Sequence, residues 1–185
     1  MKKEILQELF EKYIKGTSEK AIVASRKILL CNLTYAVLDG VKIEESIKGV
    51  YVTSRCLKHL FDRKPAEEFL FLLDNLHKIV RYPDKIYDNR EGKRGCFCFV
   101  KRIGGFEYLA SIEVVKFPAT EFGEAVFGVS EYGRCQESEE IHIATAFRLR
   151  DSNYIKKYTL LWDWGNGNPH RSALDTPEES TNAPQ

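Results

Sequence analysis

The sequence lacks the features that mark a secreted or membrane protein. Its first 16 residues are charged throughout and contain no apolar stretch of the kind that a signal peptide needs. No apolar run approaches the length of a membrane-spanning helix. The five cysteines are odd in number and irregularly spaced, which fits neither a disulfide framework nor a zinc knuckle. We therefore expect a cytoplasmic protein with reduced thiols and no membrane contact.

Signatures of nucleotide, metal and serine chemistry are also missing. The chain has no P-loop, no glycine-rich dinucleotide fingerprint, no zinc-protease helix motif and no nucleophile elbow. Its four histidines are scattered, and none has a carboxylate at metal-ligand spacing. We expect neither a cofactor nor a metal ion.

Neither basic nor acidic residues are in clear excess. Lys and Arg number 28 and Asp and Glu 27, so overall charge points to neither a nucleic-acid nor a membrane partner. The 185 residues, 43% of them hydrophobic, suit one globular domain with a sizeable core. Any preference for a partner must come from where the charges lie along the chain.

The N-terminal half has mainly helical periodicity. Apolar spacing, capping residues and Pro65 predict helices over 2–15, 18–31, 54–62 and 66–80, with one strand over 49–53 and a short apolar segment over 34–38. Either Thr53 or Ser54 can cap the third helix, and Pro83 follows the end of the fourth.

The C-terminal half has mainly strand periodicity. Strands are predicted over 95–103, 106–116, 140–149 and 158–164, with a hairpin turn at Gly104-Gly105 and a helical turn over 151–156. Residues 117–138 read as a long loop with a candidate short strand over 125–129. The predicted class is α+β, with N-terminal helices packed on a C-terminal antiparallel sheet of about four strands. We divide the chain into a helical extension (1–47), an α+β domain (48–164) and a disordered polar tail (165–185).

Positive charge is concentrated in the middle of the chain. Residues 48–64 hold five basic side chains against one acidic, and residues 78–102 hold eight against three. Aromatic residues alternate with them, a mixture suited to the phosphates and unstacked bases of single-stranded RNA. The structural alternative is that the cations form solvated faces and the rings belong to the core.

One helix in this region carries the candidate acid–base group. Lys58-His59 follows the 49–53 strand, and helical spacing puts His59 on one face with Arg55 and Arg63. Histidine titrates near neutral pH, which suits proton transfer. The alternative is a surface histidine beside other cations.

Two strand residues are further candidates. Strict alternation over 140–149 groups Thr145 with Ile141, Ile143 and Phe147, opposite His142, Ala144, Ala146 and Arg148. A hydroxyl on an apolar face needs a partner, so Thr145 either bonds locally or serves a site. Lys101 is an edge cation by default and a phosphate ligand if its sheet face forms a cleft.

The order of these elements resembles the barnase–EndoU–colicin–RelE nucleases, in particular their phage-associated and colicin D-like branches. The resemblance covers about 48–164 and rests on Lys58-His59, VRYPDKI (80–86), FVKRI (99–103), YLASIEVV (108–115), IHIATAFR (141–148) and Tyr158. The helices over 2–15 and 18–31 and the loop over 117–138 depart from the compact pattern of that superfamily.

The resemblance implies a metal-independent, toxin-like endoribonuclease acting on tRNA or on single-stranded RNA, with an antitoxin or immunity protein as a candidate partner. It implies that the catalytic residues are Lys58, His59, Lys101, Thr145 and Arg148. We expect RNA to contact Arg55, Arg63, Arg81, Arg102 and Tyr158. Two alternatives stay open: a non-catalytic RNA- or protein-binding module on the same scaffold, and a protein that holds a partner through its N-terminal helices.

Overall fold

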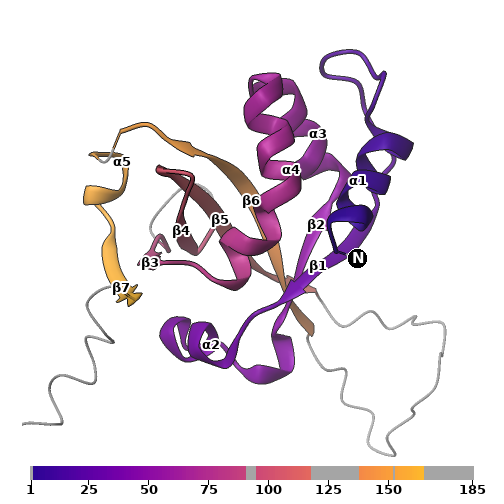
Figure 1. Ribbon diagram of the computed structural model, residues 1–185. Coiled ribbons are helices and arrows are strands. Elements are labelled where there is room, and N and C mark those ends of the chain that lie inside the picture. The colour runs from indigo at the N-terminus through magenta and orange to yellow at the C-terminus, as the bar shows by residue number, and fades with distance from the viewer. Residues whose placement is uncertain (1, 91–94, 118–137, 152, 165–185) are drawn as a thin grey trace, which may run out of the picture.

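The computed structural model describes residues 2–90, 95–117, 138–151 and 153–164, and side chains from Ile5 onward. These ranges form an α+β fold in which the three longest helices cover one face of a single mixed sheet and the shortest α-helix packs on the other face (Figure 1). The helices are α1 (Lys2–Tyr13), α2 (Tyr35–Val41), α3 (Ser54–Arg63), α4 (Ala66–Arg81) and α5 (Asn153–Lys156), with a 3-10 turn, η1 (Glu45–Ile47). The strands are β1 (Lys27–Asn32), β2 (Gly49–Thr53), β3 (Lys85–Asp88), β4 (Phe97–Ile103), β5 (Phe106–Phe117), β6 (Ser138–Leu149) and β7 (Thr159–Asp163).

The sheet has seven strands in the order β1-β2-β6-β5-β4-β3-β7. Strands β2 and β6 run parallel and every other neighbouring pair is antiparallel. The sequence therefore predicted too few strands, about four instead of seven, and it did not predict the parallel pairing of β2 with β6. The α+β class is confirmed, as is the hairpin of β4 and β5, whose turn at Gly104-Gly105 uses positive φ at both residues.

The predicted helix over 18–31 is wrong, because 27–31 belong to strand β1 and 18–26 are not helical. Lys20 adopts a left-handed conformation at φ 62°, and the chain then runs extended into a pairing with β2. Leu30 and Cys31 are both buried there, at an irregularity in the β1–β2 register. A short apolar segment fits a helix or a strand equally well, and pairing with β2, which is distant in sequence, decides between them.

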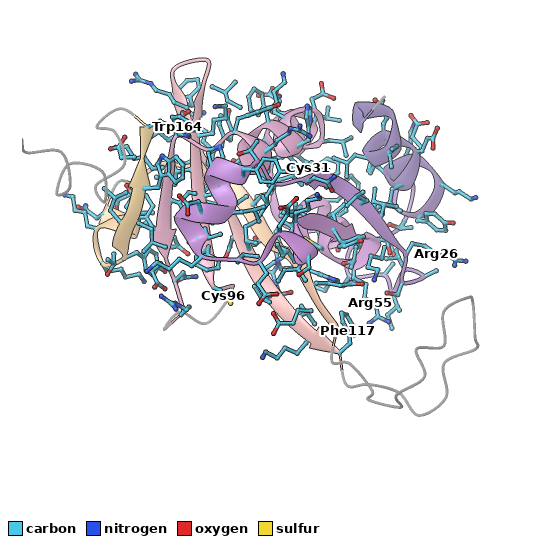
Figure 2. All side chains as sticks on the ribbon, turned by 90° about the horizontal axis from the view of Figure 1, so that it is seen from below. Arg26, Cys31, Arg55, Cys96, Phe117 and Trp164 are labelled. Carbon is cyan, nitrogen blue, oxygen red and sulfur yellow. The ribbon has the colours of Figure 1, made fainter. Side chains whose placement is uncertain are left out.

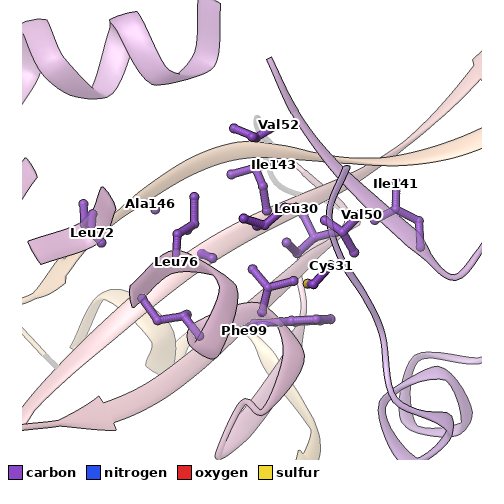
Figure 3. Packing of buried hydrophobic residues seen from close by; sticks show 14 of the residues in the cluster. Leu30, Cys31, Val50, Val52, Leu72, Leu76, Phe99, Ile141, Ile143 and Ala146 are labelled. Carbon is purple, nitrogen blue, oxygen red and sulfur yellow. The ribbon is translucent and has the colours of Figure 1, made fainter. Parts of the chain in front are cut away.

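The main core lies between the sheet and the helices. Leu72 and Leu76 of α4 pack against a sheet face that includes Val50, Ile143 and Phe99 (Figure 3). Leu6 and Leu9 of α1 belong to the same cluster, so the predicted extension over 1–47 shares its core with the predicted domain over 48–164. A second, smaller cluster of Cys98, Val100, Leu109, Leu149 and Ile155 contains a residue of α5 and lies apart from the first.

Strand β7 forms the edge of the sheet opposite to β1, and α2 packs against it. Gly40 of α2 lies against the ring of Trp162, where a Cβ would approach Cε3 to 2.1 Å, so only glycine fits. Trp164, which follows β7, lies at the opposite end of the molecule from Arg55 at the start of α3 (Figure 2). The predicted loop over 117–138 and tail over 165–185 lie almost wholly outside the described residues.

Candidate functional site

A hollow beside α3 contains four of the predicted site residues. We call it the α3 pocket, and its volume is about 460 Å³. One wall is α3 and the other is the segment between α1 and β1. Its lining consists of Glu19, Lys20, Ala21, Ile22, Val23, Arg55, Lys58, His59, Asp62 and Arg63.

Local sequence explains why α3 presents these side chains. The hydroxyl of Thr53 accepts a hydrogen bond from Cys56 N at 3.1 Å and begins the helix, which confirms one of the two predicted caps. Leu57 and Leu60 are buried in the main core, so the face bearing Arg55, His59 and Arg63 points away from it. The hydroxyl of Ser54 accepts from Arg26 N and donates to Ala24 O, which fastens the opposite wall to the start of α3.

The floor of the pocket is a buried ion pair. Lys58 Nζ donates to the Asp62 carboxylate and to Ser18 O, the latter at 2.9 Å, and Lys20 N–H donates to Asp62 at 3.1 Å. Only 5% of the Lys58 side chain is exposed. Burial opposes ionisation of Asp62, but the hydrogen bonds from Lys58 and Lys20 outweigh it and hold the Asp62 pKa below its usual value. Lys58 therefore joins the segment 18–20 to α3.

The rim of the pocket is basic on one side and apolar on the other. Arg55 and Arg63 are exposed, His59 is half-buried, and Ile22 is 96% exposed on the facing wall. His59 and Asp62 line the same pocket, so a protonated His59 would also lower the Asp62 pKa. The rim thus offers two guanidinium groups, an imidazole and an apolar wall, which together can receive a phosphate and a flat ring.

Lys101 does not line the α3 pocket. Its Nζ donates to Tyr82 O at 2.6 Å and to Asp84 at 3.0 Å, where α4 leads into β3. It lines a hollow of about 220 Å³ that also contains Arg81 and Trp164. Because Trp164 and Arg55 lie at opposite ends of the molecule (Figure 2), Lys101 and Arg81 are far from His59.

Arg148 and Arg102 line a third hollow, which we call the arginine hollow. Its volume is about 460 Å³, and it lies where β6 ends beside the β4–β5 turn. The guanidinium carbon of Arg148 lies 3.5 Å from the centre of the Phe106 ring. The lining consists of Arg102, Gly105, Phe106, Glu107, Arg148, Leu149 and Arg150.

Thr145 lies on the face of the sheet opposite to the one predicted. An extra residue, Ala144, interrupts the pairing of β6 with β5, so that Ile143 and Ala146 face the main core while Thr145 and Phe147 face away from it. Thr145 is paired with Ser111, in a row that continues to Cys98 of the second cluster. Tyr158 packs against that same cluster. The bulge is the reason that strict alternation failed here.

A polar cluster on β1, β2 and β6 was missed by the sequence analysis. Lys27 Nζ bonds both carboxylate oxygens of Glu140, at 2.7 and 2.6 Å, and His142 Nε2 lies 2.9 Å from Glu140. The rings of Tyr51 and Phe117 flank His142. Burial opposes ionisation of Glu140, but its bonds to Lys27 and His142 outweigh this and lower its pKa. Glu140 and His142 alternate with Ile141 and Ile143, a period that could have revealed the pair.

Three searches for known relatives gave no assignment. Neither protein-family models, nor curated proteins, nor solved structures match this chain. The resemblance to nucleases stays a prediction. Over the described ranges, no three or more His, Cys, Asp or Glu side chains gather where they could hold a metal ion. In the same ranges, every helix is too short or too polar to cross a bilayer.

Proposed function

We propose that this protein is a metal-independent endoribonuclease whose reaction centre is the α3 pocket. The observation that carries the proposal is the placement of Arg55, His59 and Arg63 along the rim of one hollow. Two guanidinium groups can hold a phosphate by charge-assisted hydrogen bonds, and the imidazole between them lies within the same hollow. The apolar wall at Ile22 suits the ring of a base.

RNA supplies its own nucleophile, so the protein needs few catalytic groups. On this proposal His59 accepts the proton of the 2′-hydroxyl, the O2′–P bond forms and the P–O5′ bond breaks. The leaving 5′ oxygen takes up a proton from water, and His59 then returns its own proton to the solvent. The products are a 2′,3′-cyclic phosphate and a 5′-hydroxyl. Proton transfer of this kind contributes roughly 10²–10⁴-fold to the rate. Arg55 and Arg63 stabilise the extra negative charge of the crowded phosphate.

The proposal keeps only part of the set that the resemblance implies. Lys58 acts here as a positioning residue, because its ammonium group is already bonded to Asp62 and Ser18. Lys101, Thr145 and Arg148 lie outside the α3 pocket and take no catalytic role. The substrate on this proposal is tRNA or a single-stranded RNA in the cytoplasm. A toxin-like activity of this kind calls for an antitoxin or immunity protein as a partner.

A second candidate function is a non-catalytic RNA- or protein-binding module. Of the five predicted catalytic residues, only Lys58 and His59 line the α3 pocket, and Lys58 is held in an ion pair. A pocket with one imidazole and two arginines can bind RNA without cleaving it. Binding that falls with salt but gives no turnover would favour this function.

The deciding experiment uses total tRNA and a single-stranded RNA in the presence of EDTA. Wild type should produce defined fragments that end in a cyclic phosphate, His59→Asn should produce none, and Arg55→Ala should slow cleavage. The matched control is Lys12→Ala/Lys15→Ala, which removes two exposed cations from the end of α1 and should cleave at the wild-type rate. Equal cleavage by wild type and His59→Asn, with both folded, would remove His59 from the reaction.

A further inference from the structure

The arginine hollow contains a stacking platform on the surface. Phe106 follows the glycine turn of the β4–β5 hairpin, and 47% of it is exposed. The Arg148 guanidinium covers part of its ring at 3.5 Å from the centre. An exposed ring with a guanidinium beside it provides a flat face and a positive charge, and unstacked nucleobases prefer that combination.

The arginines of the hollow differ in whether a carboxylate binds their guanidinium groups. Glu68 of α4 accepts a hydrogen bond from Arg148 N at 3.1 Å and from the Arg150 guanidinium at 2.6 Å. The Glu68 side chain is 7% exposed, so this bond to Arg150 is firmly placed. Arg102 is exposed at the opposite side of the same hollow. Arg102 and Arg148 are therefore the guanidinium groups that the hollow presents to a phosphate.

Lys64 connects the arginine hollow with the α3 pocket. It directly follows Arg63 of the pocket rim, and its Nζ lies 5.0 Å from the centre of the Phe147 ring. Phe147 directly precedes Arg148 of the arginine hollow, so the Lys64 ammonium group lies close to that hollow as well. Basic side chains thus recur from Arg55 and Arg63 of α3 through Lys64 to Arg148 near the end of β6.

We infer that one strand of RNA runs from the α3 pocket past Lys64 into the arginine hollow, where a base stacks on Phe106 and Arg102 and Arg148 hold the adjoining phosphate. The inference rests on the proposed function and defines its substrate as an extended single strand. From Arg55 to Arg63 alone the helix rises by about 12 Å, so the full track exceeds a dinucleotide. A duplex cannot offer an unstacked base to Phe106, which makes single-stranded RNA the preferred form.

Other charged groups of the described chain are less suited to this role. Lys27, Glu140 and His142 are bonded to one another, and Lys101 is bonded to Asp84 and Tyr82 O. A phosphate arriving at either place would have to displace a carboxylate. At the arginine hollow it would approach an exposed Arg102 and an Arg148 that stacks on a ring.

Binding of labelled RNA to the His59→Asn protein tests the track without interference from cleavage. An oligonucleotide of about twelve nucleotides should bind more tightly than one of about four, because only the longer strand reaches both hollows. Phe106→Ala and Arg102→Ala/Arg148→Ala should each weaken binding of the longer strand about ten-fold. Lys12→Ala/Lys15→Ala, which removes the same charge as the double arginine variant, should leave it unchanged.

The outcomes separate this inference from the proposed function. Unchanged binding of the longer strand in folded Phe106→Ala and Arg102→Ala/Arg148→Ala proteins would overturn the track, even if wild type cleaves RNA. Equal affinity for single-stranded and duplex RNA would overturn it as well. Weakened binding in these variants would support the track even if no cleavage is found, and the α3 pocket would then be a binding site only. Phe106 is exposed, so Phe106→Ala should stay near the wild-type melting temperature, and a melting curve checks that Arg102→Ala/Arg148→Ala is folded.

Discussion

The floor and the rim of the α3 pocket carry the same kinds of charge in different surroundings. On the floor, Lys58 and Asp62 are bonded to each other, with side-chain exposures of 5% and 12%. On the rim, Arg55 and Arg63 are exposed on the same helix. A buried cation costs free energy unless it keeps its carboxylate, whereas an exposed cation can exchange water for a phosphate at little cost. The floor therefore stabilises the fold, and we propose that the rim is the part that binds RNA.

The same contrast recurs at the other basic sites. Lys101 bonds Asp84 and the main chain at Tyr82, as Lys58 bonds Asp62 and the main chain at Ser18. Both lysines were predicted to be catalytic, and the ammonium group of each is already bonded to a carboxylate. The exposed arginines of the two larger hollows are better suited to that role, because a guanidinium can bond a phosphate through two parallel N–H groups.

The largest effect should come from removing the carboxylate of the ion pair on the pocket floor. In Asp62→Ala the Lys58 ammonium loses its carboxylate while it remains buried, so we expect the free energy of unfolding to fall by about 3 kcal/mol. Urea denaturation measures this loss. Lys58→Met/Asp62→Leu removes both charges and should be much closer to wild type. If Asp62→Ala is as stable as wild type, the ion pair does not hold the segment 18–20 to α3.

A smaller effect, on binding alone, should follow from changes at the rim. Arg55→Ala/Arg63→Ala should leave the free energy of unfolding within about 0.5 kcal/mol of wild type, because both side chains are exposed. RNA binding should weaken, and the slope of log affinity against log salt should become shallower by about 1.4, or about 0.7 for each lost phosphate contact. The comparison with Lys12→Ala/Lys15→Ala separates contact from net charge. An unchanged slope would mean that the rim does not touch RNA.

The sequence predicted local features of this protein well. The helices over 2–15, 54–62 and 66–80, the hairpin turn at Gly104-Gly105 and the helical turn near α5 follow from spacing, caps and glycines within a few residues. The grouping of Arg55, His59 and Arg63 was also predictable, because helical periodicity alone puts them on one face. These features need no information about distant parts of the chain.

Features that depend on distant pairing were not predictable. Strand β1 forms only because β2 lies beside it, and the parallel contact of β2 with β6 joins residues about ninety positions apart, such as Val50 and Ile141. One additional residue at Ala144 moves Thr145 to the other face of the sheet. The carboxylate partner of Lys58 is four residues away and that of Lys101 is seventeen residues away, but only the fold shows that the two ion pairs form.

The smallest effect that distinguishes the floor from the rim concerns how the free energy of unfolding depends on pH. The Asp62 pKa is below its usual value of 3.8 in the folded protein, because the hydrogen bonds from Lys58 and Lys20 N–H outweigh the effect of burial. Its contribution to stability is thus complete above about pH 4 and is lost as the pH falls through the folded-state pKa. Lys58→Met/Asp62→Leu lacks this contribution, so its free energy of unfolding should fall less steeply than that of wild type below pH 4. Arg55→Ala/Arg63→Ala should follow wild type, since arginine stays protonated throughout this range.

Other carboxylates with lowered pKa values, such as Glu140, act equally in all three proteins, so the difference between the curves isolates the contribution of the floor ion pair. If the free energy of unfolding of wild type and of Lys58→Met/Asp62→Leu falls equally with pH, the Asp62 pKa is the same in the folded and unfolded states. The distinction between floor and rim would then have no electrostatic basis.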